Sequence, residues 1–213
     1  MNTLIIDCSS GMSVYVLADE KIYSKIDKNQ KRHTDELLCV VDELLKNAGI
    51  KIQDINNLCV CIGPGSFTGI RVAISVVKGL AVESNAKVFA LTNFDIFQNV
   101  DDKNSVYVLD GFSKFVYARF VFNGETFDEC IDTEGLTNKL KECDINIFVE
   151  NEKVQNVLKN AEIKSNIAQN SIILRFLEKI NNNNQINLNT IEPVYLRASQ
   201  AEIERNKKLQ GEK

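Results

Sequence analysis

The sequence lacks tryptophan altogether, and it contains only one histidine and two prolines. With His33 as the only imidazole, a His-x-x-x-His metal site or a multi-histidine cluster is excluded. No stretch approaches the ~20 consecutive apolar residues of a membrane-spanning helix. The first residues, Met1 to Asp7, also lack the basic segment of a signal peptide. We therefore expect a soluble cytoplasmic protein with no membrane role.

The chain also has fewer basic than acidic residues, with 25 Lys and Arg against 29 Asp and Glu, so its net charge is −4. Strong unaided binding to nucleic acid normally requires a basic face, so any role on RNA is expected to depend on a partner. Six cysteines lie mostly in apolar runs of a chain without an export signal, which predicts free thiols buried in the interior. Cys59 and Cys61 share one face of a strand, but without a second cysteine pair a metal site there is not expected.

The 213 residues, of which 44% are apolar, can form one large domain or two small ones. Hydrophobic periodicity predicts an antiparallel meander followed by alternating helices and strands. The expected elements of this first part are strands Leu4–Asp7, Ser13–Ala18 and Lys21–Ile26, helix Thr34–Ala48, strand Leu58–Ile62, helix Thr68–Ser84 and strand Lys87–Leu91.

The pattern then partly repeats, because Val106–Leu109 ends in Asp110 as the first strand ends in Asp7. The expected elements that follow are strand Phe115–Phe122, helix Thr133–Cys143, strand Ile145–Val149 and helix Ser171–Ile180. This repeat predicts two related α/β lobes, residues 1–100 and 101–213. The second lobe is expected to be reduced and to end in a charged tail.

The segment Gly63-Pro-Gly-Ser-Phe-Thr-Gly-Ile-Arg71 places three glycines between an apolar strand and a helix, as phosphate-binding loops do. It lacks the lysine of a P-loop, and its spacing G-x-G-x-x-x-G differs from the dinucleotide fingerprint. Pro64 also removes one backbone donor. An anion-binding turn at the helix start remains open.

The predicted helix that follows this loop is apolar around nearly its whole circumference. Such a helix must be covered on two sides, either as a central core helix or by its own sheet and another chain. Gly79 in its interior should cost ~1 kcal/mol relative to alanine, and the close approach of another backbone would explain it. The sequence leaves the two arrangements open.

Candidate catalytic groups are few. His33 precedes a helix, where a capping or surface role is more typical than catalysis. Asp7 and Asp110 each end the first strand of a lobe, so they could be paired carboxylates that hold a metal ion and phosphates. The alternative is that each only starts a turn by bonding its own backbone.

Five motifs in one order resemble those of the TsaB (YeaZ) family. They are Ile6-Asp-Cys-Ser9, His33-Thr-Asp-Glu-Leu-Leu38, the glycine loop Gly63–Arg71, Lys78-Gly-Leu80 and Pro193-Val-Tyr-Leu-Arg197. The resemblance runs from Leu4 to about Arg197 and is strongest in the first lobe. The loop combined with the upstream His-x-x-Glu-Leu-Leu segment is highly distinctive.

The resemblance implies an actin/Hsp70-like fold of two ribonuclease-H-like lobes. It also implies a non-catalytic subunit of the complex that forms threonylcarbamoyladenosine in tRNAs reading codons that start with A. In that family the partner is the catalytic subunit TsaD, the ATPase TsaE joins the assembly, and the chain alone forms homodimers. ATP and metal are expected on the partners, with no cofactor and no metal on this chain, and tRNA is reached through the complex.

The resemblance places the partner interface on the two first-lobe helices. The expected interface residues are Leu37, Leu38, Val41, Leu45, Ile70, Ala73, Ile74, Val77 and Leu80. The family-motif positions are Asp7, Ser9, His33, Glu36, Gly63, Pro64, Gly65, Ser66, Phe67, Thr68, Gly69, Arg71, Lys78, Gly79, Tyr195 and Arg197.

Two positions depart from the family pattern. Cys8 stands where the family usually has threonine, and the segment after Asp110 lacks the family's arginine and glutamate. Two other functions are weighed against the scaffold role. Asp7, Asp110 and the glycine loop could belong to an ATP-dependent phosphotransferase or ATPase of the actin-like class. A metallopeptidase is nearly excluded by the single histidine.

Overall fold

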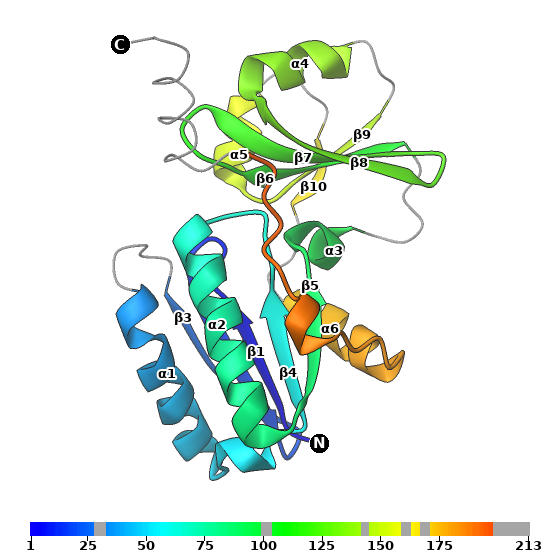
Figure 1. Ribbon diagram of the computed structural model, residues 1–213. Helices are drawn as coiled ribbons and strands as arrows, with labels where there is room; N and C mark the ends of the chain where they lie inside the picture. Colours follow the sequence, from blue (N-terminus) through cyan, green and yellow to red (C-terminus); the bar gives the residue numbers. More distant parts are fainter. Residues whose placement is uncertain (28–32, 99–103, 142–144, 159–162, 167–170, 198–213) are drawn as a thin grey trace.

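The computed structural model describes residues 1–27, 33–98, 104–141, 145–158, 163–166 and 171–197. They form two α/β lobes, one above the other in Figure 1, each built on a five-stranded mixed sheet. The strand orders are β3-β2-β1-β4-β5 and β10-β9-β6-β7-β8. Read from its other end, the second order is β8-β7-β6-β9-β10, which is the first order with every strand replaced by its counterpart. The repeat expected from the sequence is therefore present as a repeated topology.

The first sheet consists of β1 (Thr3–Asp7), β2 (Met12–Ala18), β3 (Lys21–Asp27), β4 (Asn57–Cys61) and β5 (Lys87–Leu91). The first three strands pair antiparallel, whereas β4 is parallel to both β1 and β5. Parallel neighbours need a crossover, and α2 (Phe67–Ser84) supplies the one between β4 and β5. A short 3-10 turn, η1 (Ile52–Asp54), precedes β4.

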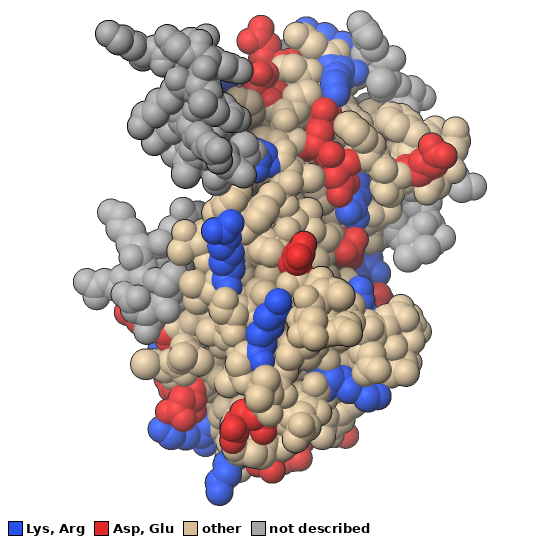
Figure 2. Space-filling view, viewed as in Figure 1, with Lys and Arg blue, Asp and Glu red and all other residues tan. Residues whose placement is uncertain are grey.

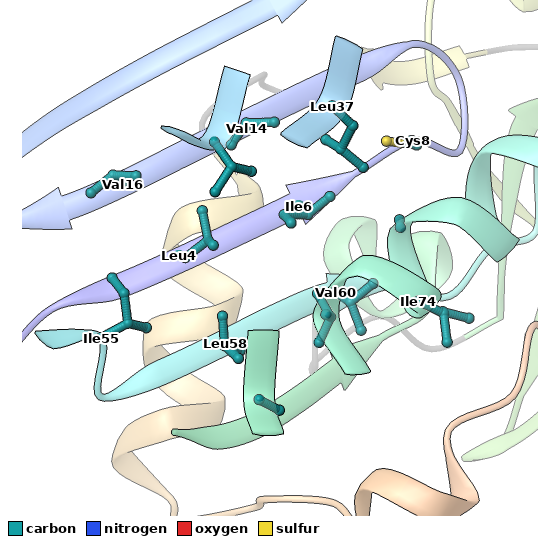
Figure 3. Packing of buried hydrophobic residues seen from close by; sticks show 14 of the residues in the cluster. Leu4, Ile6, Cys8, Val14, Val16, Leu37, Ile55, Leu58, Val60 and Ile74 are labelled. Carbon is teal, nitrogen blue, oxygen red and sulfur yellow. The ribbon is translucent and has the colours of Figure 1, made fainter. Parts of the chain in front are cut away.

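Helices α1 (His33–Ala48) and α2 cover one face of this sheet, side by side (Figure 1). Figure 3 shows their side chains meeting those of the strands, with Leu37 and Ile74 near Ile6 and Val60. All four side chains are at least 95% buried. The helical stripes predicted from the sequence therefore face the sheet, and Gly49, with φ 71°, ends α1 as expected.

The opposite face of the first sheet is covered by α6 (Ser171–Asn181), a helix from the far end of the chain. Ile172 and Phe176 pack with Ile5, Cys59 and Phe89 of the sheet. The chain then stays on this lobe: the Ile186 N–H donates to the Val88 carbonyl oxygen at 2.9 Å. A second 3-10 turn, η2 (Leu188–Thr190), follows. The division at residue 100 remains a proposal, to which the structure adds that 171–191 lies against the first sheet.

The second sheet consists of β6 (Ser105–Asp110), β7 (Phe115–Phe122), β8 (Glu125–Asp132), β9 (Asn146–Val149) and β10 (Ile163–Asn166). Short helices α4 (Thr133–Lys141) and α5 (Glu152–Val157) cover its outer face. These helices are much shorter than α1 and α2. The α/β class and the paired ribonuclease-H-like lobes of an actin/Hsp70-like fold are confirmed.

A five-residue helix, α3 (Asn93–Phe97), joins the two lobes. Ile96 packs into the first lobe's second core, while Phe94 packs into the core on the inner face of the second sheet. Arg119 of β7 reaches it: the guanidinium pairs with Asp95 at 2.8 Å and with Asp128 of β8 at 2.7 Å. Its Cζ also lies 4.8 Å from the ring centroid of Phe94. The arginine therefore ties the helix between the lobes to the second sheet.

The thiols partly follow the expectation. Cys8, Cys59 and Cys61 are buried and free, and Cys130 is half-buried and free. Cys39 is also free but lies exposed on α1, which corrects its assignment to an apolar interior. Cys143 lies outside the described residues. Among the helices that are described, none is long and apolar enough to cross a membrane.

Arg119→Ala is expected to lower the free energy of unfolding by about 2–3 kcal/mol, because it leaves two partly buried carboxylates without their cation. Chemical denaturation measures this loss. Lys25→Ala is the matched control, since its pair with Glu43 is about half exposed on both sides and should contribute less than about 1 kcal/mol. Equal losses of stability for the two variants would show that Arg119 does not hold α3 to the second sheet.

Candidate functional site

The glycine loop between β4 and α2 packs against the end of β1. A Cβ atom on Gly65 would lie 2.4 Å from the Ser9 carbonyl oxygen, and one on Gly69 would lie 2.1 Å from that of Cys8. Both distances are far below any contact that a real side chain makes. The Ser66 N–H donates to the Ser9 carbonyl oxygen at 2.7 Å, and its side chain caps the helix by accepting from the Gly69 N–H at 3.2 Å. The glycines therefore accommodate the chain's own backbone.

Asn93, at the start of α3, organises the polar groups beneath this loop. Its side-chain Nδ2 donates to the Pro64 carbonyl oxygen at 2.7 Å, and its N–H donates to that of Gly63 at 2.8 Å. The Asn93 Oδ1 accepts from the Cys61 thiol at 2.6 Å and from the Ser9 hydroxyl at 3.3 Å. This one buried amide thus connects β1, β4, the loop and α3.

The Pro193–Arg197 motif lies beside the loop, although more than 120 residues separate them in the sequence. The Val194 N–H donates to the Ile62 carbonyl oxygen at 2.8 Å. The rings of Phe67 and Tyr195 stack with centroids 4.1 Å apart and an interplanar angle of 3°. Arg71 donates from Nε to the Tyr195 hydroxyl, and its Cζ lies within 6 Å of both ring centroids. Two family motifs are therefore one structural unit.

Arg197 continues this unit towards the second lobe. Its Cζ lies 4.7 Å from the ring centroid of Phe112, in the turn between β6 and β7. Burial raises the pKa of the Tyr117 phenol. The charge of the Arg197 guanidinium and its hydrogen bond to Tyr117 lower this pKa, but by less than burial raises it. The last described residue thus contacts the lobe opposite to the one on which its own segment runs.

A cleft of about 690 Å³ opens between the lobes. Asp7 and Ser9 line it from the first lobe, and Asp110 and Glu150 from the second. Arg197 is the one basic side chain among its lining residues that the structure describes. The two strand-ending aspartates predicted from the sequence do face the same cleft, and Glu150 joins them.

The carboxyl groups of Asp7, Asp110 and Glu150 form hydrogen bonds or ion pairs with neighbouring groups of the protein. Asp7 accepts from the Ser9 N–H at 2.8 Å, as a turn-starting aspartate does. Asp110 pairs with Lys153 at 2.8 Å, and its N–H donates to Glu150 at 2.7 Å. Burial raises the pKa of Asp7, and burial together with the charges of Asp110 and Asp7 raises the pKa of Glu150. Nearby, burial raises the pKa of the Cys8 thiol to about 12, which leaves it protonated and unreactive at neutral pH.

This arrangement does not fit a nucleoside triphosphate. The space over Gly65 and Gly69 is filled by the Cys8 and Ser9 carbonyls, and the Ser66 N–H already donates to one of them. Several carboxyl groups surround the remaining volume, where phosphates would need cations or free N–H donors. Within the described part of the chain, no three His, Cys, Asp or Glu side chains gather so as to hold a metal ion. The side chain of His33 lies outside the described residues.

The partner interface expected on the helices needs correction. Seven of its nine residues have at most 7% of their surface exposed, because they form the lobe's own core. They are Leu37, Val41, Leu45, Ile70, Ala73, Ile74 and Val77. Leu38, by contrast, is 56% exposed, and Leu80 is half-buried. Periodicity identified apolar helix faces, but those faces pack inwards on the sheet.

The outward face of α2 carries a different set of residues. Its exposed or half-buried members include Thr68, Val72, Ser75, Val76, Gly79 and Val82, together with the charged residues Arg71, Lys78 and Glu83. Val82 is 74% exposed, and outside the backbone of α2 itself no described atom lies within 4 Å of a Cβ placed on Gly79. No packing contact among the described residues therefore explains the glycine, and its helical neighbours on this face are Ser75, Val76, Val82 and the exposed Glu83.

Sequence reasoning missed Asn93 and Glu150. Asn93 lies two residues after β5, in a helix too short to show a periodic pattern. Glu150 directly follows β9, and the position of a carboxyl group at the end of a parallel strand was the available signal.

A family model described as TsaD, tRNA N6-adenosine threonylcarbamoyltransferase, matches residues 20–135, which is more than half of the chain. A TsaB protein of Buchnera aphidicola from Acyrthosiphon pisum is 24% identical over 87% of this chain and 93% of its own length. The Escherichia coli TsaB protein is 35% identical, but over 38% of this chain and 36% of its own length. A second Buchnera TsaB, from Schizaphis graminum, is 34% identical over 45% of its length. These last two matches span less than half of the relative.

Two solved structures from Pseudomonas aeruginosa share the fold. One, described as similar to the peptidase YeaZ, superposes with a TM-score of 0.70 at 20% identity, covering 92% of this chain and 99% of the other. The other, YeaZ itself, gives a TM-score of 0.67 over the same shares. Together with the five motifs found in the sequence, these similarities show that the chain belongs to the TsaB (YeaZ) family, within the wider family that the TsaD model describes.

Proposed function

We propose that this chain is a non-catalytic subunit that binds TsaD and supports the formation of threonylcarbamoyladenosine in tRNA. The curated relatives carry the name of threonylcarbamoyladenosine biosynthesis proteins, and the family model carries the name of the transferase. The observation that supports a binding role is the outward face of α2, which is apolar, solvent-facing and open at Gly79. TsaE is the expected third subunit, and a homodimer is expected in the absence of TsaD.

The proposed partner surface consists of the outward residues of α2 together with Leu38 of α1. Small side chains at Ser75 and Gly79, one helical turn apart, leave room for the backbone of a partner helix to come close. Val72, Val76 and Val82 supply apolar area beside them. Isolated apolar residues are common on surfaces, but a contiguous apolar stripe along one helix indicates an interaction site.

The cleft supports the non-catalytic part of the proposal. Its carboxyl groups are bonded to neighbouring groups, its thiols are buried, and its glycine loop is packed against β1. The alternative, an actin-like phosphotransferase, requires a phosphate-binding loop with free donors, and the loop here has its Ser66 N–H engaged. ATP and metal are therefore assigned to the partner subunits.

Reconstitution tests the role directly. TsaD and TsaE with this chain should convert a tRNA that reads a codon starting with A far faster than TsaD and TsaE alone, by at least about tenfold. The incorporation of labelled threonine into tRNA is the measurement. A chain without TsaD and TsaE should give no product. Equal rates with and without the chain would refute the proposal.

The partner surface is tested at Gly79. Gly79→Ala should raise the free energy of unfolding by about 0.5–1 kcal/mol, since alanine loses less backbone entropy and meets no atom of this chain. Gly79→Arg should keep the fold but weaken binding to TsaD at least about tenfold, because its long charged side chain blocks close approach. Calorimetry with TsaD measures the affinity. Asn138→Arg, at an exposed position of α4, is the control, and unchanged TsaD binding by Gly79→Arg would place the interface elsewhere.

The variant Asp7→Asn distinguishes the proposed non-catalytic role from a phosphotransferase activity. A carboxyl whose pKa is raised by folding binds its proton more tightly in the folded chain, so it lowers stability as the pH rises above its unfolded pKa of about 3.9. The variant should therefore be more stable than the wild type at pH 7, with a gain that vanishes towards pH 4. Asparagine can still accept the Ser9 N–H. Denaturation at several pH values measures the gain.

In the reconstituted system Asp7→Asn should leave tRNA modification unchanged. A complete loss of modification by a stably folded Asp7→Asn variant would favour the phosphotransferase.

A further inference from the structure

We infer that a row of three cations, Arg197, Arg71 and Lys78, together with the stacked rings of Phe67 and Tyr195, forms a surface that contacts RNA directly. The inference rests on the proposed function, which supplies tRNA as the RNA, and it assigns this chain a contact of its own. We call these five residues the cationic row.

The three cations differ from many others in this chain because no described carboxylate pairs with them. Lys25, Lys46 and Lys139, for example, each form an ion pair with a nearby acid. Arg71 instead donates to a phenol and Arg197 lies on a phenylalanine ring. The Nε of Arg197 is buried and has no hydrogen-bond partner among the described residues, while the guanidinium also bonds to Tyr117. Cations that are not neutralised within the protein keep their charge available for phosphates.

The spacing suits an extended polyanion. Arg71 and Lys78 are seven residues apart on α2, which is two helical turns, so they lie on the same flank about 10.5 Å apart along the axis. Arg197 extends the row from the start of α2 to the second lobe, where it contacts Phe112. Figure 2 shows basic side chains over α2 on a face whose surroundings are mostly uncharged. The overall charge of −4 is therefore not distributed evenly over this face.

The aromatic rings point to a nucleic acid as the anion. The Tyr195 ring is stacked on Phe67, flanked by the Arg71 guanidinium, and 37% exposed; Phe112 is 57% exposed under Arg197. Unpaired bases of RNA loops stack on aromatic rings and on arginine planes, which is how proteins recognise single-stranded RNA. An acidic polypeptide would use the cations but would leave these rings without a planar partner.

The row borders the proposed partner surface, because Ser75 and Val82 of that surface lie one helical turn after Arg71 and Lys78. Val72, Val76 and Leu80 lean towards the α1 side of α2 and pack partly on the lobe's core. Arg71 and Lys78 lie on the opposite flank, next to the segment that carries Tyr195. A partner seated on the α1–α2 side would leave the row at the rim of the interface, where an RNA held by both chains could reach it.

Fluorescence anisotropy with an unmodified anticodon stem-loop, on the complex of this chain with TsaD, tests the row. The double variant Arg71→Ala/Lys78→Ala should raise Kd about tenfold, and the slope of log Kd against log salt should become shallower by about 1–2, since two phosphate contacts are lost. Lys78→Ala alone should give a smaller change in the same direction. It keeps the test valid if the loss of the Arg71–Tyr195 contact disturbs folding.

Lys179→Ala, on α6 across the first sheet from α2, is the charge-matched control and should change Kd less than twofold. The inference is wrong if the double variant stays folded and bound to TsaD yet binds RNA as the wild type does. It is also wrong if polyglutamate binds as tightly as the stem-loop. Failure of the wild type to bind TsaD would instead refute the proposed function, and the same titration on the chain alone would still decide whether the row binds RNA.

Discussion

The close contact between the glycine loop and the end of β1 positions most of what surrounds it. The Cys8 and Ser9 carbonyl oxygens occupy the space that side chains at positions 65 and 69 would need. Only glycine allows α2 to start so near the first strand, and the Ser66 cap then sets the direction of the helix. That direction places one face of α2 on the core and the opposite face, with Gly79, in solvent.

The same contact explains why the loop has the position of a phosphate-binding loop but little space for a phosphate. The loop approaches its own sheet so closely that its Ser66 N–H donates to the Ser9 carbonyl oxygen, and little room is left over Gly65 and Gly69 for an anion. Asn93 then bonds the Gly63 and Pro64 carbonyl oxygens and holds α3 beneath the loop. Through α3, the Arg119 guanidinium joins the second lobe to the first, so the cleft is framed by structural interactions.

Much of the fold could be predicted because it depends on periodicity and on end signals. The limits of α1, α2, β5 and β7 agree with the sequence to within one residue. β8 was missed, since Glu125–Asp132 has no regular apolar alternation and is stabilised by pairing with β7. α3 was missed because five residues show no period. The return of α6 to the first sheet is a long-range contact that local patterns cannot reveal. The interface residues expected from the sequence include seven core residues for a related reason: a helix that is apolar all round does not show which side faces its own sheet.

The sequence by itself determined the two-lobed α/β class, the family, the strand-to-helix position of the glycine loop and the exclusion of a multi-histidine metal site. Each of these depends on local composition, spacing or order along the chain. The tertiary structure decided which apolar residues are core and which are surface, and that the loop's glycines serve close backbone packing. It also brought Arg71 to Tyr195 across more than 120 residues. These outcomes depend on which distant segments pack together, because burial and free hydrogen-bonding groups are properties of the folded chain.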